Sequence, residues 1–138
     1  PQTKQCHNEP PFELDGVHFR YFPLPPMPDR NSYSCVLQVQ TKTQRILLVG
    51  DIEKKSEKYL VKTYGNALHS DILVVPHHGS KTSSTLDFIR AVQPKEAWIA
   101  SGQWNQYRLP HHAILKRYQK EGVLIKNTEK RCRPSFPK

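Results

Sequence analysis

The sequence predicts an α/β fold, in which strands and helices alternate in layers, and three features lead to this prediction. Short apolar runs of strand length are followed by polar turns and then by stretches with helical periodicity. This plan recurs three times between residues 45 and 122. Glycine or proline stands where the predicted helices begin or end. The chain has 138 residues, the size of one domain, so we expect one layered unit.

The first third of the chain is predicted to be β-structure. Residues 17–28 are half apolar and rich in proline, which indicates one short strand that runs into an extended loop. Residues 34–40 alternate as a strand does, and residues 45–49 form a continuous apolar run. The polar residues 41–44 lie between them, so we expect a hairpin whose second strand is buried on both faces.

The rest of the chain predicts helices separated by short strands. Ser84, with Asp87 three residues later, is expected to cap the second helix, and Pro110 is expected to be the first residue of the third. Residues 127–138 are expected to form an irregular, basic tail. The predicted helices span residues 52–64, 84–93 and 111–121, and the strands between and after them span residues 71–75, 97–100 and 123–126.

The net charge of +9 favours a polyanionic partner, with nucleic acid as the first candidate and an anionic membrane surface as the second. Ordinary solvated helix faces also carry such charges, so this alternative stays open. No apolar run is long enough to span a membrane, and residues 1–11 lack the pattern of a signal peptide. The clustered basic residues are Lys54, Lys55, Lys58 and Lys62 on the first predicted helix and Lys116, Arg117, Lys120, Lys126, Lys130, Arg131, Arg133 and Lys138 near the end.

The three cysteines, Cys6, Cys35 and Cys132, are too scattered for a Cys-x-x-Cys metal site and too few for a disulfide scaffold. Buried or free thiols are the favoured interpretation. One structural disulfide, which would leave one thiol over, is the alternative. The sequence does not identify which two cysteines would pair.

Polar side chains follow three successive predicted strands. Asp51 comes after the first, His77 and His78 after the second, and Asn105 lies in the loop after the third. Ligands collect at the carboxyl ends of strands in such folds, and carboxylate oxygen and imidazole nitrogen bind Zn²⁺, Mn²⁺ or Fe²⁺. Taken one by one, Asp51 is more typical of a helix N-cap and the histidines of solvated loop residues. Their joint placement predicts part of a metal site.

A second group of residues predicts contacts to phosphate or DNA. Hydroxyl groups and a lysine at a predicted helix start suit a phosphate, although capping of the helix is a competing role. In the third loop, Trp104 and Tyr107 are candidates to stack unpaired bases, and Asn105 is a candidate to hold substrate. The candidate phosphate contacts at the helix start are Ser80, Lys81, Thr82 and Ser83.

Several stretches together resemble the ComEC family of membrane proteins, which take up DNA during natural competence. The resemblance is carried by residues 47–53 with Glu57, by residues 71–84 and by residues 31–37. Cys6 with the stretch from Asp15 to Phe19 is similar to the proteobacterial members. The His-His-Gly-Ser element at residues 77–80, followed by Thr-Ser-Ser, is the most distinctive part, and the likeness extends over most of the chain.

The resemblance implies a metallo-β-lactamase fold of αββα layers, of which this chain is the C-terminal portion. Asp51 would bridge two divalent metals, Mn²⁺ or Zn²⁺. His77 is the preferred ligand, and His78 would be a second ligand, a proton donor or a phosphate contact. The implied activity is metal-dependent hydrolysis of DNA, which degrades the strand that does not enter the cell. The partners would be DNA and the rest of a protein in the bacterial inner membrane, with this soluble domain on the periplasmic side.

Two departures from the family pattern put the site in doubt. The family's main metal motif, of the His-x-His-x-Asp-His type, is absent and would precede Pro1, so the isolated chain is expected to be inactive. Leu109 replaces a family histidine. Substitution by His111 or His112 is one alternative, and exposure of both to solvent is the favoured prediction. Asn31, where other members place a metal-binding histidine, is predicted to be a turn or supporting residue.

Two other functions therefore stay open. The first is a catalytically incomplete domain that binds DNA and guides it to the uptake channel. The second is hydrolysis of a small ester or a phosphocholine-type substrate, which the fold permits because fold alone does not fix function. The charge of +9 disfavours this last alternative.

Overall fold

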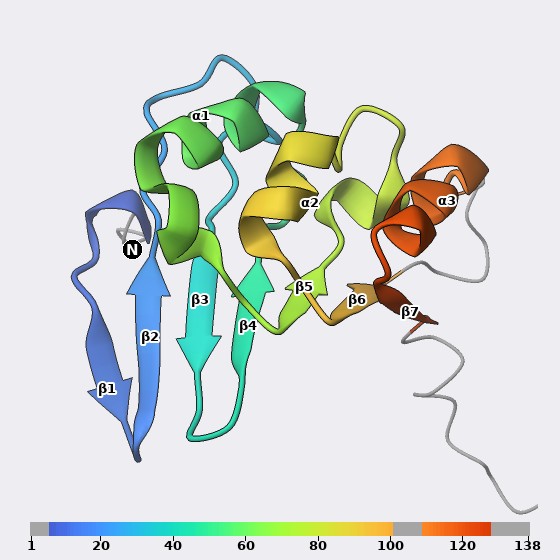
Figure 1. Ribbon diagram of the computed structural model, residues 1–138. Helices are drawn as coiled ribbons and strands as arrows, with labels where there is room; N and C mark the ends of the chain where they lie inside the picture. The colour runs from blue at the N-terminus through green and yellow to red at the C-terminus, as the bar shows by residue number, and fades with distance from the viewer. Residues whose placement is uncertain (1–5, 101–108, 128–138) are drawn as a thin grey trace, which may run out of the picture.

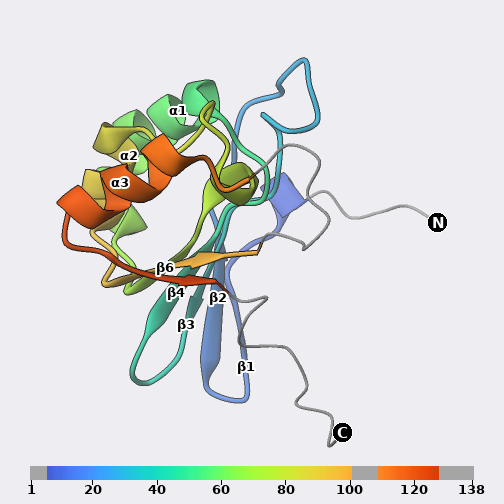
Figure 2. The same ribbon diagram turned by 90° about the vertical axis from the view of Figure 1, so that its right-hand side faces the viewer.

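The computed structural model describes residues 6–100 and 109–127, which form one seven-stranded sheet with helices on one side (Figures 1 and 2). The strands are β1 (Phe12–Leu14), β2 (Val17–Tyr21), β3 (Leu37–Gln40), β4 (Arg45–Leu48), β5 (Ile72–Val74), β6 (Glu96–Ile99) and β7 (Leu124–Asn127). The α-helices are α1 (Lys54–Tyr64), α2 (Leu86–Val92) and α3 (His112–Lys120). Short 3₁₀ turns are η1 (Cys6–Asn8), η2 (Gly65–Leu68) and η3 (Pro76–Gly79).

The strands lie in the sheet in the order in which they occur in the chain. Strands β1 to β4 pair antiparallel, and β4 to β7 pair parallel. The predicted hairpin is confirmed, because β3 and β4 pair directly and the Thr41 amide donates to the Gln44 carbonyl at 2.8 Å. Each parallel connection carries a helix, so β4, β5 and β6 end at one edge of the sheet, where the described loops after β4 and β5 lie.

One face of the sheet is covered by the helices and forms the core. Strand register places Leu47, Leu73 and Ala97 side by side on this face, and each is fully buried. Helix α1 buries Leu60 against them, while its lysines remain exposed, which is the amphipathic pattern of a surface helix. Burial of each such leucine contributes about 1.5–3 kcal/mol to folding.

The opposite face of the sheet is also apolar but is not covered by any described element. Leu48, next to Leu47 in β4, is paired with Val74 and is 37% exposed. Phe12 and Leu124, on the same face at the two ends of the sheet, are 46% and 59% exposed. The prediction that residues 45–49 are buried on both faces is therefore wrong for the described chain, because the helices cover only one face.

Two further predictions about the elements are wrong in detail, and one strand was not predicted. Thr85, not Ser84, caps α2, since its hydroxyl oxygen accepts the Phe88 amide at 3.4 Å while Ser84 has a left-handed backbone with φ 59°. Helix α3 begins after Pro110, with His111 as its N-cap. Strand β1 was not expected, because its three residues are too few to show a pattern.

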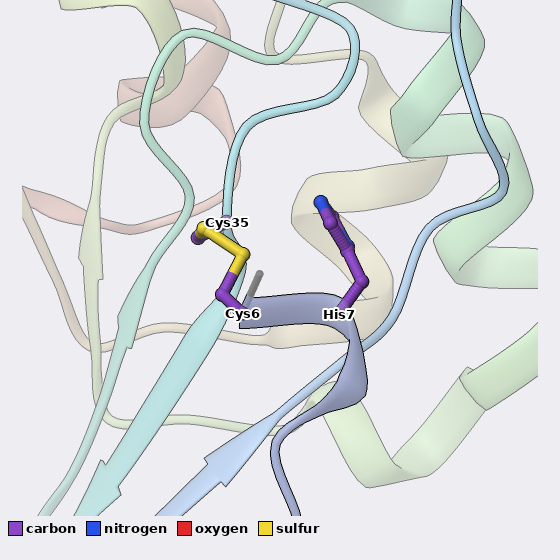
Figure 3. Close-up of side chains that lie close together, drawn as sticks. All are labelled: Cys6, His7 and Cys35. Carbon is purple, nitrogen blue, oxygen red and sulfur yellow. A yellow bond between two sulfur atoms is a disulfide. The ribbon is translucent and has the colours of Figure 1, made fainter. Parts of the chain in front are cut away.

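Cys6 and Cys35 form a disulfide across a sequence separation of 29 residues (Figure 3). This result overturns the favoured interpretation of free thiols, because η1 lies beside the loop before β3. Closing a loop of this length stabilises the fold by roughly 3–4 kcal/mol in the chain-entropy account. Cys132 lies outside the described residues.

Within the described ranges, none of the helices combines the length and the apolar character that crossing a bilayer requires.

Candidate metal and phosphate site

The loops after β4 and β5 meet at one edge of the sheet and bring the predicted ligands together. Asp51 follows β4, and η3 after β5 carries His77 and His78. The two loops are joined by a hydrogen bond in which the His77 amide donates to the Gly50 carbonyl at 3.0 Å. Asp51 does not cap α1, because Glu53 stands at the N-cap position. The carboxylate of Asp51 is therefore available to the site.

The two ring nitrogens of His78 have different neighbours. Its Nδ1 lies 2.5 Å from the Ala100 carbonyl, and because a carbonyl only accepts, Nδ1 carries the hydrogen. Nε2 faces the Asp51 carboxylate, with Oδ1 at 3.4 Å, and is the nitrogen that would be free to bind a metal in the neutral ring. A ligating histidine commonly donates its other ring N–H to a backbone carbonyl in this way. Asp51 and His78 thus present an oxygen and a nitrogen to the same point.

His77 is held differently from its neighbour. Its Nδ1 is buried and lacks a hydrogen-bond partner within the described chain, while Oε2 of Glu53 lies 3.6 Å away. The two imidazole rings are 6.5 Å apart at an angle of 62°. Both histidines have left-handed backbones, with φ of 49° and 55°. Strain of this kind is found where surrounding structure fixes a loop for function.

The residues present fit a divalent cation in part. Asp51 and His78 would supply two ligands of the right chemistry, and the His77 nitrogen without a hydrogen-bond partner in the described chain is a third candidate within the same loop. They do not form a compact trio, since the one group of three such side chains with ligand atoms within 4.8 Å in residues 6–100 and 109–127 is Cys6, His7 and Cys35. A closed zinc site needs four ligands, so the site is incomplete in these residues.

The trio around the disulfide is not arranged for a metal. The sulfurs of Cys6 and Cys35 are bonded to each other, and Figure 3 shows the His7 ring directed away from them. Both ring nitrogens of His7 are engaged, since Nε2 lies 3.2 Å from the Tyr33 carbonyl and Nδ1 accepts the Leu24 amide at 3.2 Å. This group therefore ties the N-terminal segment to the sheet.

A buried carboxylate holds the loop that follows the histidines. Glu57 of α1 is fully buried and accepts the backbone amides of Ser84 and Thr85 at 2.6 and 2.7 Å. Burial raises the pKa of the Glu57 carboxyl, and the bonds from Thr85 and Ser84 oppose that rise. The two amide bonds fix the path of the loop against α1.

Helix α3 holds the same loop from the other side. The Tyr118 hydroxyl lies 2.8 Å from the Ser84 hydroxyl, and the Arg117 guanidinium donates to the Ser84 carbonyl at 2.6 Å. Burial raises the pKa of Tyr118, so the phenol stays protonated. Gly79 (φ 86°) packs so closely on the segment before α3 that an added Cβ would lie 2.5 Å from the Pro110 Cβ. The histidine loop is therefore clamped between α1 and α3.

The candidate phosphate contacts divide into two groups. Lys81 and Thr82 are exposed, and the hydroxyls of Ser80 and Thr82 are 2.9 Å apart at the same edge. Ser83 is fully buried and donates to the Ile52 carbonyl at 2.6 Å, so the prediction that it contacts phosphate is wrong. The candidates Trp104, Asn105 and Tyr107 lie outside the described residues.

Two supporting features agree with the predictions for Asn31 and the helix-start histidines. The Asn31 carbonyl accepts the Ser34 hydroxyl at 2.9 Å, and the Ser34 oxygen accepts the Asp51 amide at 3.2 Å, so Asn31 acts through a turn. His111 and His112 are exposed, and the His111 Nδ1 accepts the Ala113 amide at 3.3 Å. In the described residues, neither of these histidines forms a hydrogen bond or ion pair with Asp51.

Sequence reasoning missed the parts played by Glu53 and Ser34. Glu53 lies two residues after Asp51, but its approach to His77 depends on the turn into α1, which no local pattern encodes. Ser34 meets Asp51 across 17 residues of sequence. The presence of a glutamate at 57 was noted, but its burial was signalled only by its place on the apolar face of a helix.

Comparison with known families agrees with this geometry. The family model of the metallo-beta-lactamase superfamily matches residues 7–103. The chain belongs to this superfamily, and its αβ layer with acidic and histidine side chains at the strand ends is consistent with it. The superfamily generally uses divalent metals.

Individual related proteins define the family more narrowly than the superfamily does. The chain is 38% identical to Competence protein ComA of Neisseria gonorrhoeae over 86% of its own length, and 36% identical to Recombination protein 2 of Haemophilus influenzae over 82%. It is 36% identical to ComE operon protein 3 of Bacillus subtilis over 76%. The resemblance to the ComEC family is confirmed. The chain spans only 14–17% of the length of these relatives.

Proposed function

We propose that this chain is the C-terminal half of a metal-dependent nuclease domain in a DNA-uptake protein, which degrades the strand that is not taken up. The observation that carries the proposal is the approach of His78 Nε2 to the Asp51 carboxylate, with the His78 ring held by the Ala100 carbonyl. The relatives named as competence and recombination proteins support DNA as the partner, and the net charge of +9 suits it.

The residues at the sheet edge divide the work of hydrolysis. A divalent metal, Mn²⁺ or Zn²⁺, supplies Lewis-acid chemistry and lowers the pKa of water when bound. Asp51 and His78 would hold the cation, with Asp51 as the bridge where two are present. Lys81, Ser80 and Thr82 would receive a phosphate of the strand, because they are grouped beside the histidines and accessible. Glu57 keeps this loop in place by accepting the backbone amides of Ser84 and Thr85.

The open apolar face of the sheet supports the proposal that the domain has another half. An uncovered apolar face of this kind is uncommon on a free domain and marks an interface. A preceding segment of the parent protein, one that carries a His-x-His-x-Asp-His motif, would cover the face and supply the missing ligands. In the parent, the inner membrane and the periplasmic side are the proposed location.

The assignment of His78 over His77 as metal ligand is tested in a longer form of the chain that includes the preceding segment. We expect His78→Ala to remove bound Mn²⁺ or Zn²⁺, measured by elemental analysis and calorimetric titration, since it deletes the nitrogen aimed at Asp51. His77→Ala, the matched control, should lower the affinity less. Loss of metal from the His77 variant alone would assign the ligand role to His77 instead.

The second candidate function is a DNA-guiding domain without catalysis. The shortage of ligands in the described residues favours it, as do the exposed lysines of α1 and α3. The two functions differ in one respect that is simple to measure. A longer form that binds DNA but cleaves none of it with Mn²⁺ or Zn²⁺ present would support guidance and reject the nuclease.

A further inference from the structure

A groove of about 640 Å³ lies between α2 and α3, on the helical side of the sheet. Figure 2 shows these two helices together on that side, away from the sheet's open face. The walls carry four cations and one carboxylate, and two small apolar surfaces lie between them. The lining residues are Leu86 and Arg90 of α2, Ala113, Lys116, Arg117 and Lys120 of α3, and Glu121.

The four cations of the groove differ in whether they already have a partner. Arg90 is paired with Glu121 at 3.1 Å, and Arg117 donates to the Ser84 carbonyl. Lys116 and Lys120 are exposed, and the ion pairs found in the described residues include neither of them. They are four residues apart on one face of α3, roughly 6 Å along the helix axis. The groove thus offers two unpaired cations in a row.

The groove is mechanically joined to the candidate site. At the start of α3 the His111 amide donates to the Gly79 carbonyl at 2.9 Å, directly after the histidines. Ala113, which lines one end of the groove, is two residues further on. Arg117 connects the middle of the groove to the loop at Ser84. A chain that lies along α3 would therefore arrive beside the histidine loop.

From these contacts we infer that the α2–α3 groove binds the phosphodiester backbone of a single nucleic-acid strand and directs it toward the Asp51 edge. This inference rests on the proposed function and names the path of its substrate. Lys116 and Lys120 receive successive phosphates, and Leu86 and Ala113 contact the sugar and base. The volume of the groove lies within the range of about 300–1,000 Å³ that is usual for ligand pockets. A groove of this volume would accommodate a short part of one strand.

The lysines of α1 provide the contrast. Lys58 and Lys62 have the same four-residue spacing and are exposed on the same helical layer. They do not line the α2–α3 groove. If net charge alone attracted the strand, the two lysine pairs would contribute equally to its affinity. If the groove binds the strand, the affinity would depend on Lys116 and Lys120.

The test compares two double variants of the chain by fluorescence anisotropy with a labelled oligothymidine. Lys116→Glu with Lys120→Glu changes the groove, and Lys58→Glu with Lys62→Glu removes the same charge from α1. We expect the groove variant to lose at least ~10-fold in affinity and to have a shallower salt dependence, by roughly 1.4 units for two lost phosphate contacts at about 0.7 each. The α1 variant should lose at most ~3-fold. Circular dichroism verifies that both variants are folded.

The outcomes separate this inference from the proposed function. Equal losses of affinity in the two variants, or no loss in either, would overturn the assignment of the groove as the binding site and leave DNA as a partner. Equal sensitivity of a duplex probe to the groove variant would overturn the single-strand assignment. Failure of the unaltered chain to bind any DNA at low salt would overturn the groove and the DNA partner together.

Discussion

The two faces of the sheet differ in burial although β4 is apolar on both. On the helical face Leu47 is fully buried, while on the other face Leu48, the next residue, is 37% exposed. The same strand, β4, supplies both. Hydrophobic side chains do not reveal by themselves which face has a partner, because that depends on the elements available to cover it. The difference teaches that the described residues build one core under the helices and leave an apolar face that no described element covers.

The candidate site lies at the edge of the sheet where β4 and β5 end. Its support is complete on the helical side, where Glu57, Tyr118 and Arg117 hold the loop at Ser84. Its set of candidate ligands is incomplete: in the described residues, Asp51 and His78 are the one close carboxylate–imidazole pair in which both residues are predicted ligands. The proposed missing half of the domain would account for both the uncovered face and the shortage of ligands.

The largest expected effect is a difference between neighbouring leucines. Leu47→Ala should lower the free energy of unfolding by about 2–5 kcal/mol, because it leaves a cavity under the helices. Leu48→Ala in the same chain should cost less than about 1 kcal/mol, since its side chain already meets solvent. Urea denaturation of the two variants measures the difference.

A longer form of the chain sharpens that comparison. When the preceding segment covers the open face, Leu48→Ala should become costly as well, at about 2 kcal/mol or more. A cost for Leu48→Ala that stays small in the longer form would contradict the proposal that this face is an internal interface. An equal cost for both leucines in the 138-residue chain would contradict the assignment of the faces.

A smaller effect is expected under the histidine loop. Glu57→Gln should lower the free energy of unfolding at neutral pH by about 1–3 kcal/mol, because the amide group cannot accept both backbone N–H bonds. Glu53→Gln, at the partly exposed start of the same helix, is the matched control and should cost less than about 0.5 kcal/mol. Thermal denaturation followed by circular dichroism compares the two.

The pH dependence of the Glu57 variant has a defined sign. Burial raises the folded-state pKa of Glu57 above its ordinary value of 4.5, so the folded chain holds the proton more tightly than the unfolded chain does. This contribution to stability is fully present below pH 4.5 and is lost as the pH rises through the folded-state pKa. Glu57→Gln should remove that loss. An unchanged pH profile would mean that Glu57 does not titrate in the fold.

Much of the fold could be predicted from the sequence because its signals are local. The helices that end at Gly65 and before Pro94 were marked by periodicity and by the residues that stop them. The error at Ser84 has a physical reason: Ser84 and Thr85 are adjacent hydroxyl residues, and the tertiary contact with Tyr118 determines which one caps the helix. Local patterns carry no information about that contact.

The candidate site was predictable in part for the same reason. Asp51 and the histidines were found because they follow successive strands, and parallel pairing brings such ends together. The preference for His77 as the ligand had no geometric basis, and the hydrogen bond from His78 to Ala100 now favours His78. The disulfide between Cys6 and Cys35 was left open because residues far apart in sequence paired by folding back.

The central claim is that Asp51 holds metal for DNA hydrolysis, and one variant tests it most directly. In a longer form that carries the preceding segment, DNA cleavage, DNA binding and melting temperature are measured for Asp51→Ala. The account predicts a folded protein that binds DNA largely as before and no longer cleaves it, since the groove lysines lie on α3 and the bridging carboxylate is gone. A slightly less stable variant that still cleaves DNA would contradict the account.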